Sequence, residues 1–82
     1  PNKFKVVLHN DDTTPMEFVI ELLKKVFQHS QEKAEEITTK VHNEGKGIAG
    51  IYYYEIAEQK AIECTMICRS AGYSLTVNVE EG

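Results

Sequence analysis

The sequence predicts a small α+β domain in which three helices pack on one face of a three-stranded antiparallel sheet. Three short segments alternate apolar and polar residues with the period of a strand, and three longer segments repeat apolar residues with the period of a helix. Their order is strand, helix, helix, strand, helix, strand, without an internal repeat or a low-complexity stretch. We therefore expect residues 1–82 to form one domain with a single core.

The first strand is expected over residues 3–9. Phe4, Val6 and Leu8 alternate there with more polar neighbours, so one face of the strand is apolar. An Asn-Asp-Asp-Thr-Thr run at residues 10–14 then ends the strand, because Asn and Asp side chains bond nearby backbone groups and favour turns.

A helix is expected to follow this turn and to continue to about His29. Thr14 suits the cap position, Pro15 suits the first helical position, and Glu17 would complete a capping box with Thr14. The helix has a wide apolar face. The residues of that face are Met16, Val19, Ile20, Leu22, Leu23, Val26 and Phe27.

A second helix is predicted from its signals at both ends. Ser30 can cap its start, Glu32 adds a negative charge to its first turn, and Gly45 can end it. Its apolar stripe is narrower and consists of Ala34, Ile37 and Val41.

The rest of the chain is expected to add a strand, a helix and a final strand. Residues 48–53 favour a pleated surface, with Gly50 indicating a bulge or a close backbone approach. A helix over residues 54–71 would end at Gly72, and residues 75–80 alternate as a last strand. The third helix shares one face among Ala57, Ala61, Cys64, Cys68 and Ala71.

Charge and cysteine content narrow the possible functions. Lys and Arg number 9 against 13 Asp and Glu, so the net charge is −4, which argues against nucleic acid or an anionic membrane as the main partner. No apolar run approaches the roughly 18 residues of a membrane span. Cys64 and Cys68 lie one helical turn apart, a spacing that predicts two buried thiols rather than a disulfide and fits a reducing compartment.

No catalytic motif is present. The sequence lacks HExxH, CxxC and a glycine-rich phosphate loop, and neither cysteine has a spacing that implies a base beside it. A metal site of His42 with Asp11 and Asp12 would be a weak pattern, since two ligands would come from one turn and the third from a distant helix. We therefore expect no enzyme activity, no metal and no cofactor.

Asn10, Asp11 and Asp12, together with His42, form the most informative group of polar residues. They offer an amide oxygen, carboxylates and an imidazole nitrogen as acceptors, without a balancing Lys or Arg. Such a set suits a cation, and a protein α-amino group is mostly cationic at neutral pH. An ordinary Asx-rich turn and a surface histidine would explain the same residues.

Two motifs resemble the ClpS adaptor family. Residues 6–19, VVLHNDDTTPMEFV, resemble the family signature, and residues 41–47, VHNEGKG, resemble its second motif. The likeness continues without a gap through the third helix and the last strand. It implies an adaptor that binds proteins with a bulky hydrophobic N-terminal residue (Leu, Phe, Tyr or Trp) and delivers them to a Clp-type AAA+ unfoldase for proteolysis.

The resemblance also implies site residues. Asn10, Asp12 and His42 match the acceptors of the α-amino group, with Asp11 close by. Residues that match the walls of the hydrophobic pocket are Thr14, Met16, Val19, Thr38, Val41 and Leu75. Thr38 departs from the family, which often has a Met there, so we expect a pocket that is less strict against Ile and Val. A small residue on the helix surface would be the simpler interpretation of Thr38.

Glu55 and Lys60 match positions that contact the N-terminal domain of the unfoldase, of ClpA or ClpC type. Both are expected on the charged side of the third helix, where a merely solvated face would look the same. The resemblance implies a monomer in the bacterial cytoplasm or the plastid stroma. Two alternatives stay open: an N-degron-reading module of a larger ubiquitin ligase, and a ribosomal-stalk-like interaction domain.

Overall fold

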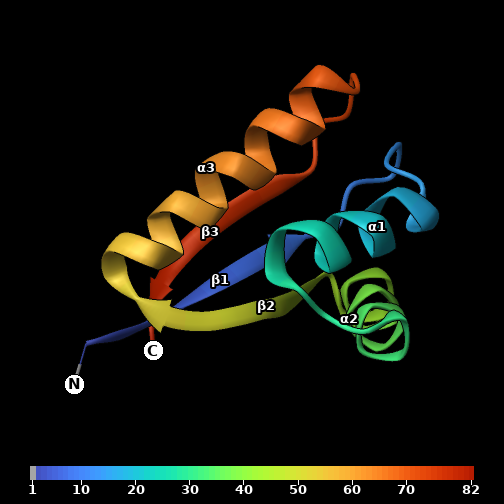
Figure 1. Cartoon of the computed structure of the whole chain (residues 1–82). Helices are drawn as coiled ribbons and strands as arrows, with labels where there is room; N and C mark the ends of the chain where they lie inside the picture. Colours follow the sequence, from blue (N-terminus) through green and yellow to red (C-terminus); the bar gives the residue numbers. More distant parts are fainter. Residues whose placement is uncertain (1) are drawn as a thin grey trace.

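The computed structural model describes residues 2–82 and has the predicted order of elements. Figure 1 shows the three strands side by side, with α3 running along the sheet and with α1 and α2 at one end of it. The elements are β1 (Lys3–His9), α1 (Met16–Phe27), α2 (Gln31–Glu44), β2 (Lys46–Tyr53), α3 (Tyr54–Ser70) and β3 (Thr76–Glu81).

The sheet is antiparallel, with β1 between β2 and β3. Val6 lies opposite Gly50 while Val7 lies opposite Ile48, so Ala49 is an extra residue in β2. This bulge confirms the irregularity predicted near Gly50. A side chain at position 50 would also collide with the ring of Tyr52 in its present position, so glycine fits here without moving that ring.

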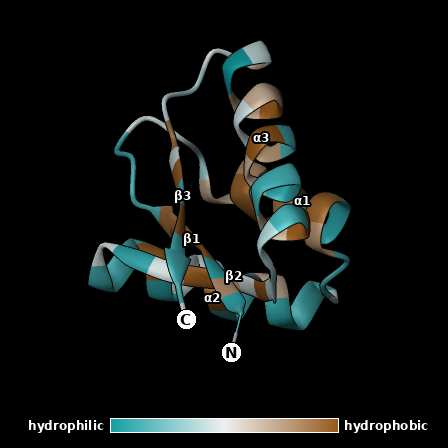
Figure 2. Cartoon of the chain, turned by 90° about the vertical axis from the view of Figure 1, so that its left-hand side faces the viewer, coloured by the Kyte–Doolittle hydropathy of each residue, from teal (hydrophilic) through white to brown (hydrophobic). Residues whose placement is uncertain are grey.

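All three helices cover the same face of the sheet, as the sequence predicts. Figure 2 shows α1 and α3 on one side of the strands. The Val41 side chain of α2 lies against Gly47, whose partner across the sheet is the core residue Leu8, so α2 covers that face too. The main core members from the strands and the loop before β3 are Val6, Leu8, Ala49 and Leu75, and the largest from the helices are Val19, Leu22, Leu23, Val26, Phe27, Ile37 and Val41.

The predicted capping box at the start of α1 is wrong. The helix begins at Met16, and its cap residue is Pro15, whose carbonyl accepts hydrogen bonds from the Phe18 and Val19 amides. The Thr14 hydroxyl instead donates to the carboxylate of Asp11 at 2.5 Å. The Thr14 hydroxyl is thus bonded to the Asp11 carboxylate and not to the helix amides, which the sequence pattern predicts as its partners.

The other element boundaries agree with the sequence to within two residues. α1 ends at Phe27, earlier than expected, because Gln28 adopts a left-handed conformation with φ of 55°. In α2 the hydroxyl of Ser30 accepts from the Lys33 amide, as predicted, and Gly45 ends the helix with φ of 91°.

The predicted state of the cysteines is confirmed. Cys64 and Cys68 are both free thiols and both fully buried on the face of α3 that packs against the core. Among residues 2–82, no helix is both long and apolar enough to cross a membrane.

Candidate functional site

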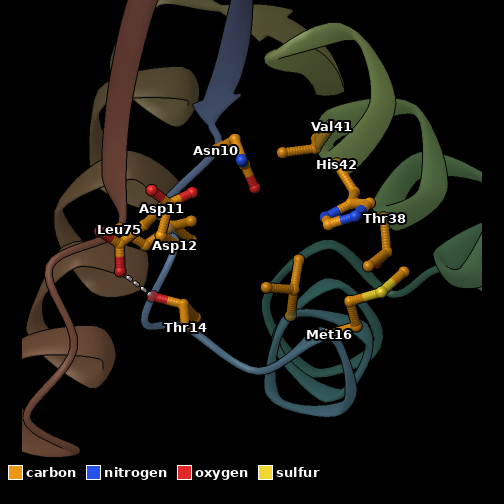
Figure 3. Close-up of a pocket in the computed structure, with 10 residues that line it drawn as sticks. Asn10, Asp11, Asp12, Thr14, Met16, Thr38, Val41, His42 and Leu75 are labelled. Carbon is orange, nitrogen blue, oxygen red and sulfur yellow. Dashed lines mark hydrogen bonds between the residues drawn. The ribbon is translucent and has the colours of Figure 1, made fainter.

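A cavity of about 250 Å³ opens where the turn after β1 meets α1, α2 and the loop before β3 (Figure 3). Three segments that are far apart in the sequence, residues 10–19, residues 38–42 and residue 75, contribute to its walls. The lining residues are Asn10, Asp11, Asp12, Thr14, Met16, Val19, Thr38, Val41, His42 and Leu75. The structure therefore brings together every residue that the resemblance implies for the α-amino group and for the hydrophobic pocket.

The turn after β1 is organised by the carboxylate of Asp11. Its Oδ2 accepts hydrogen bonds from the hydroxyls of Thr13 at 2.8 Å and Thr14 at 2.5 Å, and its backbone carbonyl accepts from the Thr14 amide. The Thr14 hydroxyl, followed by that of Thr13, lowers the pKa of the Asp11 carboxyl because hydrogen bonds favour the charged form. Asp11 thus shapes the turn and lines the cavity, with one oxygen already engaged.

The neighbouring acceptors are exposed at the mouth of the cavity. Asn10, Asp12 and His42 are all exposed, and no hydrogen bond between described residues uses their side chains. The backbone amide of Asn10 donates to the Gly45 carbonyl at 2.8 Å, and this bond links the turn to the end of α2. This backbone bond holds Asn10 and Asp12 across the mouth from His42, as Figure 3 shows.

The deeper walls belong to the core. Val19, Val41 and Leu75 are buried, whereas Met16 is 42% exposed at the rim. Every one of these side chains presents carbon or sulfur atoms, so the deep part of the cavity suits an apolar group. Binding by these walls would use the same side chains that stabilise the fold.

The loop that carries Leu75 is fixed by a residue that the sequence analysis did not single out. Arg69, in the last turn of α3, donates through Nη1 to the carbonyls of Tyr73 at 2.9 Å and of Leu75 at 3.0 Å. The sequence could have pointed to Arg69 as a basic residue in the last turn of a helix, since such residues often bond free carbonyls there. Arg69 thereby positions one wall of the cavity.

Thr38 is a buried member of the wall and not a residue of the helix surface. Its side chain is 2% exposed, and its hydroxyl oxygen has no hydrogen-bond partner among the described residues. The simpler interpretation, a small surface residue on the second helix, is therefore wrong.

Glu55 and Lys60 lie on α3 and do not line the cavity. Glu55 is exposed in the first turn, as expected. Lys60 differs from the expectation of a solvated charge, because its Nζ donates to the Val26 carbonyl at 2.8 Å. The same ammonium lies 5.4 Å from the centre of the Tyr52 ring and 5.9 Å from that of Phe27. Lys60 therefore links α3 to the end of α1.

The two thiols and the possible metal ligands of the described residues bear on whether the chain could carry out chemistry. Burial raises the pKa of both thiols, Cys64 and Cys68, so neither is a ready nucleophile. Within residues 2–82, no group of three or more His, Cys, Asp or Glu side chains could hold a metal ion.

Comparisons with known proteins identify the family. The family model described as "ATP-dependent Clp protease adaptor protein ClpS" matches residues 1–78. The chain belongs to the ClpS adaptor family. A protein of Vibrio atlanticus (strain LGP32) named "ATP-dependent Clp protease adapter protein ClpS" is 48% identical over 81 residues, which are 99% of this chain and 76% of the relative.

Further relatives agree. A Helicobacter hepaticus (strain ATCC 51449 / 3B1) protein with the same name is 44% identical over 99% of this chain and 82% of its own length. The solved structure of Agrobacterium tumefaciens ClpS2 bound to L-phenylalaninamide superimposes with a TM-score of 0.96 at 36% identity, covering 100% of this chain and 99% of that one. Matches of this extent to free ClpS adaptors do not favour the ubiquitin-ligase module or the ribosomal-stalk-like domain.

Proposed function

We propose that this ClpS adaptor holds the first residue of a substrate protein in the cavity, and that it delivers substrates with an N-terminal Leu, Phe, Tyr or Trp to a Clp AAA+ unfoldase. The observation that carries the proposal is the cavity itself, with exposed acceptors at its mouth and apolar walls below them. A related ClpS2 is known bound to L-phenylalaninamide, a molecule that carries both a free α-amino group and a bulky side chain.

The mouth of the cavity provides for the α-amino group. A protonated amine has three N–H donors and no acceptor, and the Asn10 amide oxygen, the Asp12 carboxylate and the His42 imidazole nitrogen can accept from it. Hydrogen bonds that involve an ionised group are the strong ones. An internal peptide segment offers a single amide N–H in place of the ammonium and would leave acceptors without a partner.

The lower part of the cavity provides for the first side chain. The cavity as a whole, with a volume of about 250 Å³, suits one bulky residue, and its deeper walls are mainly apolar. Moving an apolar side chain from water into such a site gains about 1.5 to 3 kcal/mol for a residue the size of Leu or Phe. Residue selection therefore follows from size and apolar character.

Binding of peptides that differ only in their first residue tests this proposal. We expect peptides that begin with Leu, Phe, Tyr or Trp to bind, and peptides that begin with Ser or Glu to bind at least tenfold more weakly, as measured by fluorescence anisotropy. An N-acetylated copy of the best peptide is the control, since acetylation removes the charge and two donors. Equal binding of the acetylated and free peptides would contradict the amine site.

Delivery would use the surface of α3. We propose Glu55 and Lys60 as contacts with the N-terminal domain of a ClpA- or ClpC-type unfoldase. Glu55 is the cleaner of the two to test, since it is exposed, whereas Lys60 also holds the Val26 carbonyl. Glu55→Arg should weaken the unfoldase complex and leave peptide binding unchanged, while Glu32→Arg in the first turn of α2 changes the charge equally and should affect neither.

The remaining parts of the proposal concern the state of the adaptor. Residues 1–82 would act as one adaptor domain and as a monomer, without catalytic activity, metal or cofactor. We propose the bacterial cytoplasm or the plastid stroma as its location, where a Clp unfoldase would be available. Unfolding and peptide-bond hydrolysis would both belong to the machine to which it delivers substrates.

A further inference from the structure

Two hydroxyls belong to the walls of the cavity, and that of Thr14 is bonded to Asp11, whereas that of Thr38 is not bonded to any described residue. Its oxygen is buried, and no described residue offers it a hydrogen bond. A buried hydroxyl without a partner has lost its hydrogen bonds to water without forming new ones, and such groups are uncommon in native proteins. Val41 and Val19, the neighbouring wall residues, have no polar side-chain atom that could satisfy it.

Thr38 lies one helical turn from His42, which stands at the mouth of the cavity. It precedes His42 by four residues on α2, so the two side chains share one face of the helix about 6 Å apart along its axis. Figure 3 shows Thr38 next to His42 and close to Met16, on the same side of the cavity. That separation is similar to the distance from the α-carbon of a tyrosine to its phenol oxygen.

The side chain of Thr38 is free to present its hydroxyl to a bound residue. Threonine in a helix divides between two rotamers, one of them held when the hydroxyl bonds to a preceding carbonyl. No such bond holds Thr38, so rotation about χ1 can turn the hydroxyl toward the cavity. Met16, which is 42% exposed and unbranched, can move aside as a ligand enters.

We propose that Thr38 is a specificity-determining residue whose hydroxyl pairs with a hydrogen-bonding group at the far end of the first side chain. The inference rests on the proposed function and sharpens it: the preferred first residue is Tyr rather than Phe. Tyrosine gives the buried hydroxyl a partner, whereas phenylalanine leaves it unpaired. A site built to bond a polar atom discriminates strongly against the analogue that lacks it.

Two peptides that differ only by Tyr or Phe at the first position test the inference on three proteins. The unmodified protein should prefer the Tyr peptide by roughly 3- to 10-fold. Thr38→Val keeps the shape of the side chain and removes the hydroxyl, so the preference should vanish or reverse. Thr38→Ser keeps the hydroxyl and should keep the preference. The same Tyr-to-Phe ratio in Thr38→Val as in the unmodified protein would overturn the inference.

The outcomes separate this inference from the function on which it rests. If free-amine Tyr and Phe peptides do not bind the unmodified protein, both ideas fail. If they bind and N-acetylation abolishes binding, but Thr38→Val does not change the Tyr-to-Phe ratio of affinities, only the inference fails. Thr38→Val should also unfold at the same or a higher denaturant concentration, because it buries no unpaired hydroxyl. A clearly less stable Thr38→Val would mean that the hydroxyl is already paired, and would overturn the inference as well.

Discussion

The two ends of the cavity differ in their relation to the fold. The acceptors at the mouth, Asn10, Asp12 and His42, are exposed, whereas the deep walls, such as Val41 and Leu75, are members of the core. A substitution at the mouth can therefore change binding alone. A substitution in the deep walls changes binding and folding together, so pocket shape and stability are coupled in this domain.

The largest expected effect is at the deep end. Leu75→Ala should lower the free energy of unfolding by about 2 to 5 kcal/mol, because a core leucine that is 1% exposed leaves a cavity when it is truncated. Urea unfolding measures the loss. Met16→Ala is the matched control, since Met16 lines the same cavity but is 42% exposed, and it should cost much less stability. Equal losses for the two variants would contradict the distinction between wall and rim.

At the mouth, binding should change without a change in stability. Asp12→Asn removes a charged acceptor and should weaken binding of a Phe-initiated peptide on the order of 10- to 100-fold. Its free energy of unfolding should stay within about 0.5 kcal/mol, because Asp12 is exposed. Glu17→Gln removes a nearby exposed charge in the first turn of α1 and should change neither quantity. A peptide affinity unaffected by Asp12→Asn would remove Asp12 from the amine site.

The next largest effect on peptide binding is expected from a change in the size of the pocket. Thr38→Met fills space in the wall, so binding of peptides that begin with Ile or Val should fall about tenfold relative to a Leu peptide. Titrations of the three peptides on both proteins measure this ranking. An unchanged ranking would show that Thr38 does not control access of β-branched residues.

A smaller effect is expected from the neutral acceptor at the mouth. His42→Ala removes a ring nitrogen that can accept a hydrogen bond from the ammonium, so the affinity for a Phe-initiated peptide should fall by roughly 3- to 10-fold. His42→Gln keeps a neutral acceptor and should lose less, and titration of the same peptide on both variants measures the difference. An unchanged affinity in His42→Ala would remove His42 from the amine site.

The smallest effect concerns the turn that supports the mouth. The Thr14 and Thr13 hydroxyls lower the pKa of Asp11, so its contribution to stability is present above the unfolded value of about 3.9 and is lost as pH falls through the lower folded value. Thr14→Val should move the Asp11 pKa up toward 3.8, whereas Thr14→Ser should not. Carbon-detected NMR titration of the carboxyl group measures both. An unshifted pKa in Thr14→Val would show that Thr14 does not stabilise the charged carboxylate.

The repeating patterns of the chain were sufficient to predict the elements and their order. Apolar periodicity depends on which face of an element is buried, and that follows from the sequence alone. The cap of α1 could not be predicted in the same way, because the Thr14 hydroxyl could bond either the helix amides or the carboxylate of Asp11. Choosing between two local partners requires the geometry of the turn.

The candidate site was predictable to a different extent. The residue types alone indicated a set of acceptors for a cation at Asn10, Asp11, Asp12 and His42. The apolar walls came from the family resemblance, since nothing in the local pattern separates a pocket wall from any other core residue. The contact of Lys60 with the Val26 carbonyl joins residues 34 positions apart, and its partner therefore becomes visible only in the folded chain.

The two free thiols on the buried face of α3 can report how often the core of the unlabelled protein opens. Cys64 and Cys68 are shielded, and burial keeps them in the unreactive thiol form, so a thiol reagent modifies them only when the core opens. The labelling rate of the unaltered chain then measures how often α3 leaves the sheet. The decrease in labelling rate when a peptide is bound would measure how much the peptide stabilises the closed state, and no attached dye would be needed.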